Sequence, residues 1–132
     1  MSPEDSRVGL RVVHRRYVDH THAHYGGNLV DGAYGLALFG DVATEISIWL
    51  DSDEGLFASY SDVQFRAPVR GGDVVEVEGS VRKIGTRSRT LDFELRIMCR
   101  ARPDLGASSA EVLALPLVAT TATGTIVVPQ RM

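Results

Sequence analysis

Two carboxylates, Asp41 and Glu45, stand four residues apart in a segment that is otherwise almost entirely apolar. In a helix, residues with this spacing lie on the same face. Burying an ionised carboxylate is costly unless it is paired or hydrogen-bonded, and apolar surroundings raise its pKa. A carboxylate with a raised pKa is suited to take a proton from a weakly acidic carbon and to return it to a leaving group. The pair is therefore the first candidate for general acid–base chemistry. The alternative is that both residues cap the helix end or pair with arginines at an interface.

A loop that is rich in glycine and aromatic residues lies directly before this segment and reads HYGGNLVDG from His24 to Gly32. Asn28 favours a helix N-cap with Asp31 in the first turn, and Gly32 is a second possible start. The unpaired N–H groups of a helix start can polarise a carbonyl oxygen or bind an anion. We therefore expect His24 to be a functional histidine. The expected substrate-binding residues are Tyr25, Gly26, Gly27, Asn28, Gly32 and Tyr34, although Tyr25 and Asn28 could instead pack and cap the loop.

His20, His22 and His24 alternate in this loop, a pattern that can indicate a metal site. No cluster of Cys, His or acidic residues with matching ligand spacing follows later in the chain. The sequence therefore predicts no metal centre and no cofactor apart from the substrate itself.

The composition is that of a globular protein: 132 residues form one domain, with 44% apolar and 23% charged residues. The net charge of −3 does not favour a nucleic-acid partner. No apolar run is long enough to span a membrane, and the polar N-terminus MSPEDSRVG is unlike a signal peptide. The single cysteine, Cys99, excludes a disulfide framework and favours the reducing cytoplasm.

Hydrophobic periodicity predicts one strand, one long helix that is apolar on every side, and then four antiparallel strands. This order predicts an α+β domain in which a single sheet curls around one buried helix. The expected loose tail covers residues 1–6, and an irregular excursion with one helical turn covers 102–116. The expected helix covers 28–48, and the expected strands cover 8–18, 56–67, 74–84, 90–101 and 117–128.

Several motifs in this order resemble a known family. The turn FRAPVRGGDVVEVEG is similar to one found across the hotdog fold, in which an antiparallel sheet wraps one central helix. The motifs HYGGNLVDGA, GDVATE, DEGLF, GTRSR and ATGTIVVP together resemble the 3-aminobutyryl-CoA and β-alanyl-CoA ammonia lyases. The resemblance covers nearly the whole chain after the first strand. It departs at Tyr34, where the lyases have an arginine.

The resemblance implies reversible loss of ammonia from a short β-aminoacyl-CoA, giving an enoyl-CoA. The motif GDVATE then assigns the proton transfer to Asp41 and Glu45, with Glu45 preferred as the base and Asp41 orienting the ammonium group. Two alternatives stay open. One is an acyl-CoA thioesterase, in which a helix carboxylate activates water or attacks the thioester. The other is a non-catalytic acyl-CoA-binding protein with a degenerate site, suggested by Tyr34.

A helix rises about 1.5 Å per residue, so Glu45 lies about 20–25 Å from the helix start. One chain is therefore not expected to bring Glu45 to its own His24 loop. Hotdog proteins share the site between two chains, and the resemblance implies a homodimer, or a multiple of one, with the site at its interface. The expected ligands of the CoA phosphates lie in the GTRSR hairpin and its flanks, although a solvated hairpin tip is the alternative: Arg82, Lys83, Arg87, Ser88 and Arg89.

Overall fold

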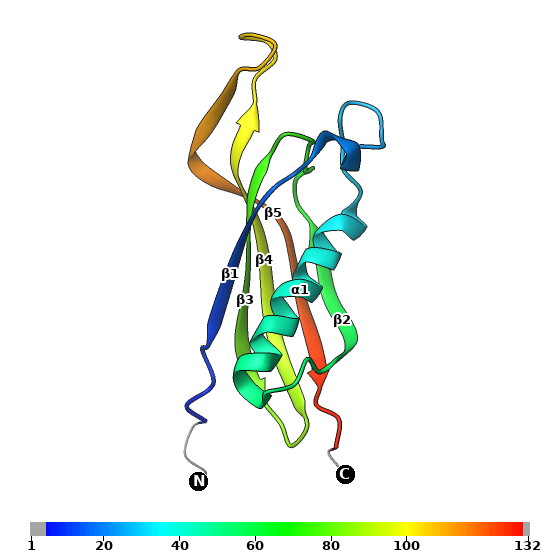
Figure 1. The fold of residues 1–132 in the computed structure, drawn as a ribbon, viewed down its shortest axis with the longest axis vertical. Coiled ribbons are helices and arrows are strands. Elements are labelled where there is room, and N and C mark those ends of the chain that lie inside the picture. Colours follow the sequence, from blue (N-terminus) through cyan, green and yellow to red (C-terminus); the bar gives the residue numbers. More distant parts are fainter. Residues whose placement is uncertain (1–4, 131–132) are drawn as a thin grey trace.

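The computed structural model describes residues 5–130 and contains one antiparallel sheet with one long helix on it (Figure 1). The strands run in the order β1-β3-β4-β5-β2, and each neighbouring pair is antiparallel. The predicted α+β architecture is therefore confirmed. Residues 1–4 of the expected tail lie outside the described residues. The elements are β1 (Arg11–Tyr17), the 3₁₀ helix η1 (His20–His22), α1 (Gly32–Asp51), β2 (Leu56–Phe65), β3 (Val74–Ile84), β4 (Ser88–Ala101) and β5 (Ala110–Val127).

The core lies between α1 and the central strands, and it follows from the period-2 alternation of the strands. In β3, Val75 and Val77 face the helix, whereas Glu76 and Glu78 face solvent on the opposite side of the sheet. Phe39 of α1 stacks on a phenylalanine of β4, with ring centroids 5.0 Å apart. The buried residues of α1 that meet the sheet are Gly35, Phe39, Val42, Ala43, Ile46 and Ser47.

The sheet covers only one side of α1. The sequence predicted a helix buried on every side, but Trp49 is 70% exposed and Ile48 is 48% exposed in the single chain. The apolar circumference that motivated the prediction is present, but one sheet cannot enclose it. No helix within residues 5–130 is long and apolar enough to cross a membrane.

The helix begins at Gly32, the second of the two predicted starts, and Asp31 is its N-cap residue. Asn28 is not the cap, because its backbone is left-handed (φ 61°) and the chain is extended between it and the helix. Leu29 bridges Arg70 there, and the Val30 N–H donates to the Val69 carbonyl at 2.9 Å. These long-range contacts hold the loop against the turn before β3.

The second part of the stretch predicted to be an irregular excursion at 102–116 is strand, whereas residues 102–109 are irregular. β5 begins at Ala110 and pairs with the end of β4, where Cys99 lies opposite Val112. The two strands form a two-stranded ribbon that extends beyond the helix (Figure 1). β5 passes through Pro116, in a region where its register with β4 shifts.

Gly79 of β3 allows the helix to approach the sheet closely. A Cβ at this position would lie 2.8 Å from Val42 and 2.9 Å from Ile46. We expect Gly79→Ala to lower the free energy of unfolding by about 1–3 kcal/mol through overpacking. The neighbouring Ser80 faces the other side of the sheet, so Ser80→Ala should stay within about 0.5 kcal/mol. Urea unfolding at one protein concentration measures both changes, and equal stability of the two variants would contradict this account of the packing.

Candidate functional site

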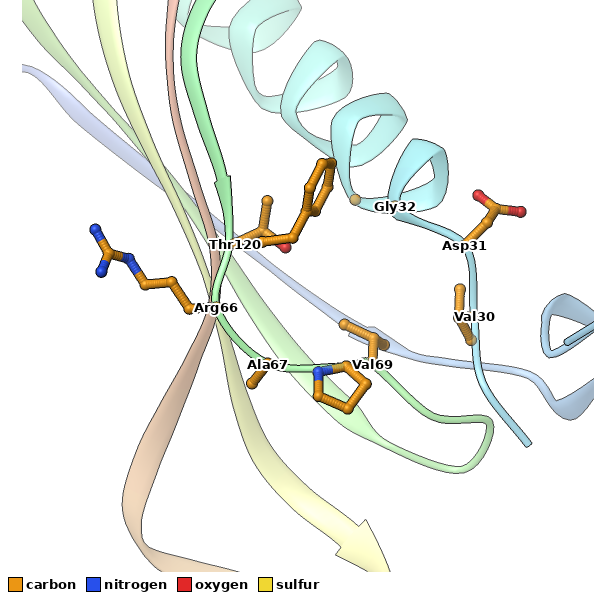
Figure 2. Close-up of a pocket in the computed structure, with 10 residues that line it drawn as sticks. Val30, Asp31, Gly32, Arg66, Ala67, Val69 and Thr120 are labelled. Carbon is orange, nitrogen blue, oxygen red and sulfur yellow. The ribbon is translucent and has the colours of Figure 1, made fainter. Parts of the chain in front are cut away.

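A cavity of about 380 Å³ opens between the start of α1 and the end of β2. Figure 2 shows the chain from Val30 to Gly32 on one side of it and the stretch from Arg66 to Val69 on the other, with Arg66 pointing away from the helix. The lining residues are Val30, Asp31, Gly32, Gly35, Phe65, Arg66, Ala67, Pro68, Val69 and Thr120.

Asp31 joins the helix start to the loop. One carboxylate oxygen, Oδ1, accepts the Tyr34 N–H at 2.9 Å, and the other, Oδ2, lies 2.5 Å from Nε2 of His24. The hydrogen bond from His24 is the main reason why the pKa of Asp31 is lowered, and the bond from the Tyr34 N–H adds to it. His24 is exposed, so it both supports the helix cap and faces solvent beside the cavity.

The start of α1 approaches the end of β2 so closely that only glycine fits at position 32, because a Cβ on Gly32 would lie 2.5 Å from the Phe65 ring. The first N–H groups of a helix have no acceptor within it, and Gly32 carries one of them at the wall of the cavity. Tyr34 is half-buried one position after Ala33, with its ring 4.6 Å from that of His22. Burial raises the pKa of the Tyr34 hydroxyl.

Tyr25, Gly26, Gly27 and Asn28 are all exposed in the loop. The Asn28 side chain donates to the Gly71 carbonyl at 2.8 Å, which ties the loop to the turn before β3. The three loop histidines point to separate partners: His20 to Asn28, His22 to Tyr34, and His24 to Asp31. No group of three or more side chains in residues 5–130 is arranged to hold a metal ion.

The two helix carboxylates differ in their surroundings. Asp41 is exposed and has no recorded hydrogen bond or ion pair within residues 5–130. Glu45 accepts two hydrogen bonds, from Nε2 of His14 at 2.8 Å and from the Trp49 indole N–H at 3.1 Å. The bond from His14, followed by the bond from Trp49, lowers the pKa of Glu45. The sequence-based expectation of a raised pKa is thus not met for Glu45, and a carboxylate of lowered pKa is a weaker base.

Sequence reasoning missed His14 and Trp49 as partners of Glu45. His14 follows Val12 at strand spacing, so both face the helix, whereas Arg15 faces the outer side and pairs with Glu76. A period-2 count along the first predicted strand would have placed His14 on the inner face. It could not have chosen Glu45 as the partner, because that pairing depends on how the helix lies across β1.

The structure does not bring the loop and the acids together within one chain. Glu45 lies thirteen residues after Gly32 in α1, which corresponds to about 20 Å along the helix axis. His24 is bound to the helix cap, and Glu45 faces β1. This separation agrees with the distance expected from the sequence.

The residues proposed for the CoA phosphates fall into two groups. Arg89 is buried: it donates to both carboxylate oxygens of Asp51, at 3.0 and 2.8 Å, and to the Gly85 and Ser88 carbonyls. It therefore fixes the hairpin to the helix end and is not free to bind a phosphate. Arg82 lies on the outer side of the sheet, paired with Asp92. Lys83, Arg87 and Ser88 are exposed at or beside the hairpin tip.

We expect Arg89→Gln to lower the free energy of unfolding by about 3 kcal/mol, because it removes the buried guanidinium that binds both carboxylate oxygens of Asp51 and leaves the more distant Arg7, at 3.6 Å. Arg87→Gln at the exposed tip should change it by less than about 0.5 kcal/mol. Thermal and urea unfolding of the two variants tests this division. Equal loss in both, or none in Arg89→Gln, would show that the buried ion pair does not hold the hairpin.

Comparisons with known proteins identify a family model, a relative and solved structures that are similar to this chain. Residues 25–98 match the family model described as the Thioesterase superfamily. The chain is 54% identical over 108 residues to a 3-aminobutyryl-CoA ammonia lyase of Acetoanaerobium sticklandii, covering 82% of this chain and 86% of that protein. A solved structure of the β-alanyl-CoA:ammonia lyase from Clostridium propionicum superposes with a TM-score of 0.87 at 36% identity, covering 92% of this chain and 86% of that one.

A hexameric hotdog-fold thioesterase of Campylobacter jejuni superposes with a TM-score of 0.72 at 17% identity, covering 89% of this chain and 81% of that one. At that identity the likeness shows the fold alone. The sheet order, the position of α1 and the comparisons lead to one assignment. This chain belongs to the β-aminoacyl-CoA ammonia lyase family of hotdog-fold proteins.

Proposed function

We propose that this protein is a carbon–nitrogen lyase that reversibly eliminates ammonia from a short β-aminoacyl-CoA, with 3-aminobutyryl-CoA as the preferred candidate. The observation that carries the proposal is the 54% identity to a 3-aminobutyryl-CoA ammonia lyase, in a chain that presents Asp41 and Glu45 on the uncovered side of its helix. No cofactor is needed, because the CoA thioester itself acidifies the proton that must leave.

Two carboxylates are sufficient to account for every proton and bond that changes in the elimination. A carboxylate takes the proton from the carbon beside the thioester carbonyl, the electron pair forms the carbon–carbon double bond, and the β-carbon–nitrogen bond breaks. A substrate that carries a β-ammonium group releases neutral ammonia, which then receives the proton from the carboxylic acid. The chemistry therefore needs one basic carboxylate and one anion that holds the ammonium group.

The surroundings of the acids favour a division of labour opposite to that preferred from the sequence. Glu45 is held as an anion by two hydrogen bonds, which suits it to bind an ammonium group. Asp41 has no recorded partner in residues 5–130, so we assign the proton transfer to it. His24, Tyr25, Gly26, Gly27 and Asn28 remain proposed as the loop that receives the acyl group, with the Gly32 N–H polarising the thioester oxygen.

We propose that two chains form each site. β2 lies at one edge of the sheet (Figure 1). Its outer backbone groups face no other strand of residues 5–130, and Leu56 and Phe65 on it are exposed. An exposed apolar edge next to the uncovered side of α1 is suited to pair with a second copy. A partner would also exclude water from the surroundings of Asp41.

The same pairing brings the hairpin of one chain toward the loop of the other. Lys83, Arg87 and Ser88 lie at the end of the molecule where α1 finishes, opposite the cavity at its start. Antiparallel packing of two helices would place this tip beside the partner's cavity. We propose Lys83 and Arg87 as phosphate ligands there. We also propose a cytoplasmic location, in keeping with the single free Cys99.

Product analysis tests the reaction. We expect 3-aminobutyryl-CoA to give enoyl-thioester absorbance and ammonia without release of free thiol. Release of free CoA without enoyl absorbance would identify a thioesterase instead. Binding of the ester without either product would identify an acyl-CoA-binding protein.

Asp41→Asn and Glu45→Gln should separate the two proposed roles. We expect Asp41→Asn to lower kcat by about 10²–10⁴-fold, the range of general acid–base catalysis. Glu45→Gln should mainly raise KM for the β-aminoacyl ester. Steady-state kinetics with a melting curve for each variant measures both effects. Full turnover in Asp41→Asn would contradict the proton-transfer assignment.

The oligomer should be a homodimer or a multiple of one, because the exposed edge and the uncovered helix side need a second chain. Sedimentation equilibrium measures this directly. Leu56→Glu would place a charge on the β2 edge outside the cavity, so we expect it to weaken assembly and activity together. Leu105→Glu is a matched apolar-to-acid change on the protruding ribbon, and we expect it to leave pairing along β2 intact. An active monomer would contradict the shared site.

A further inference from the structure

His14 is hydrogen-bonded to Glu45 and is the less exposed residue of the pair. The proposed reaction gives it no role. Its side chain is 18% exposed, whereas that of Glu45 is 44% exposed. The histidine therefore lies behind the carboxylate, and the carboxylate presents its open side to solvent. The 2.8 Å bond joins Nε2 of His14 to only one oxygen of Glu45, and each carboxylate oxygen has a second lone pair.

Arg16 sets the direction of this hydrogen bond. Its guanidinium lies 3.5 Å from Nδ1 of His14 and can only donate. An Nδ1 that accepts from Arg16 leaves the ring hydrogen on Nε2, so His14 donates to Glu45. Arg16, His14 and Glu45 thus form a chain of donors that runs from β1 to the helix and ends at the carboxylate. Trp49 donates to the other carboxylate oxygen and restrains it from the next helical turn.

We propose that His14 is a positioning residue that holds Glu45 in place as the ammonium-recognising carboxylate of the substrate site. This rests on the proposed function, since it takes the β-ammonium group of the substrate as the ligand of Glu45. The ammonium group approaches the exposed side of the carboxylate, and His14 and Trp49 fix the oxygens from behind. The Glu45 side chain is thereby restrained to one orientation before the substrate arrives, so that less conformational freedom is lost on binding.

The test separates recognition from turnover by using a ligand pair that cannot react. S-(3-aminobutyl)-CoA carries the ammonium group but has no thioester carbonyl to acidify a proton, and S-butyl-CoA is its uncharged counterpart. Calorimetry gives the dissociation constant of each, and their ratio reports ammonium recognition alone. We expect the wild type to prefer the charged ligand, and His14→Leu to reduce that preference by about tenfold, the loss of one charge-assisted hydrogen bond.

Three further variants test whether the effect passes through Glu45. His14→Gln keeps a donor and should restore most of the preference, and it also serves if His14→Leu does not fold. Arg15→Gln removes an ion pair from the same strand on the opposite side and should leave the preference unchanged. His14→Leu added to Glu45→Gln should cause no further loss, because residues that act as a unit are not additive.

The proposal is overturned if His14→Leu and His14→Gln keep the wild-type preference for the charged ligand, or if they lower the affinity for both ligands equally. It is also overturned if the wild type shows no preference at all. These outcomes are distinct from failure of the proposed reaction, which would appear as absence of enoyl-CoA from 3-aminobutyryl-CoA in the wild type. A wild type that binds the charged ligand selectively without forming product would sustain the role of His14 and remove the lyase assignment.

Discussion

One sheet of five strands can cover only one side of a twenty-residue helix, and the rest of the structure depends on this constraint. The covered side of α1 holds Phe39, Val42 and Ile46 in the core. The uncovered side carries apolar residues such as Trp49 together with the acids Asp41 and Glu45. The same side of α1 therefore offers apolar surface on which a second chain can pack and carboxylates that can take part in the reaction. The proposed dimer and the proposed site are therefore two consequences of one packing limit.

The chemistry of the two acids differs because their neighbours differ, although both stand on the same helix face. Glu45 meets β1, where His14 donates to it, and Trp49 adds a second donor from its own helix. These bonds favour the charged form of Glu45, which makes it a better ligand for a cation and a poorer acceptor of a proton. Asp41, one turn earlier, has no such partner recorded in the described part of the chain. The identities of the two side chains alone pointed the other way, because glutamate has the longer reach and the higher intrinsic pKa.

The sequence was sufficient for the elements whose signals are local. The alternation in Val74–Ile84 predicted β3 to the residue, and the long apolar segment predicted α1. The features that the sequence could not predict depend on long-range contacts. Asn28 looks like a cap, but its side chain and backbone are engaged by Gly71, so Asp31 takes that role. In the sequence Arg89 looks like a surface cation, but in the fold it is buried in an ion pair with Asp51 at the far end of the helix. His14 became a candidate only when the helix was placed against β1.

Subunit complementation tests the central claim, that each site combines the loop of one chain with the helix acids of another. Two inactive variants are refolded together: one carries Asp41→Asn with Glu45→Gln, and the other carries Gly32→Val, which would collide with Phe65 and disturb the helix start. The account predicts that each variant alone is inactive and that the mixture regains up to about a quarter of wild-type activity, since half of the dimers are mixed and each holds one site with both sets intact. A mixture as inactive as its components, with mixed dimers demonstrated by mass spectrometry, would contradict a site shared between two chains.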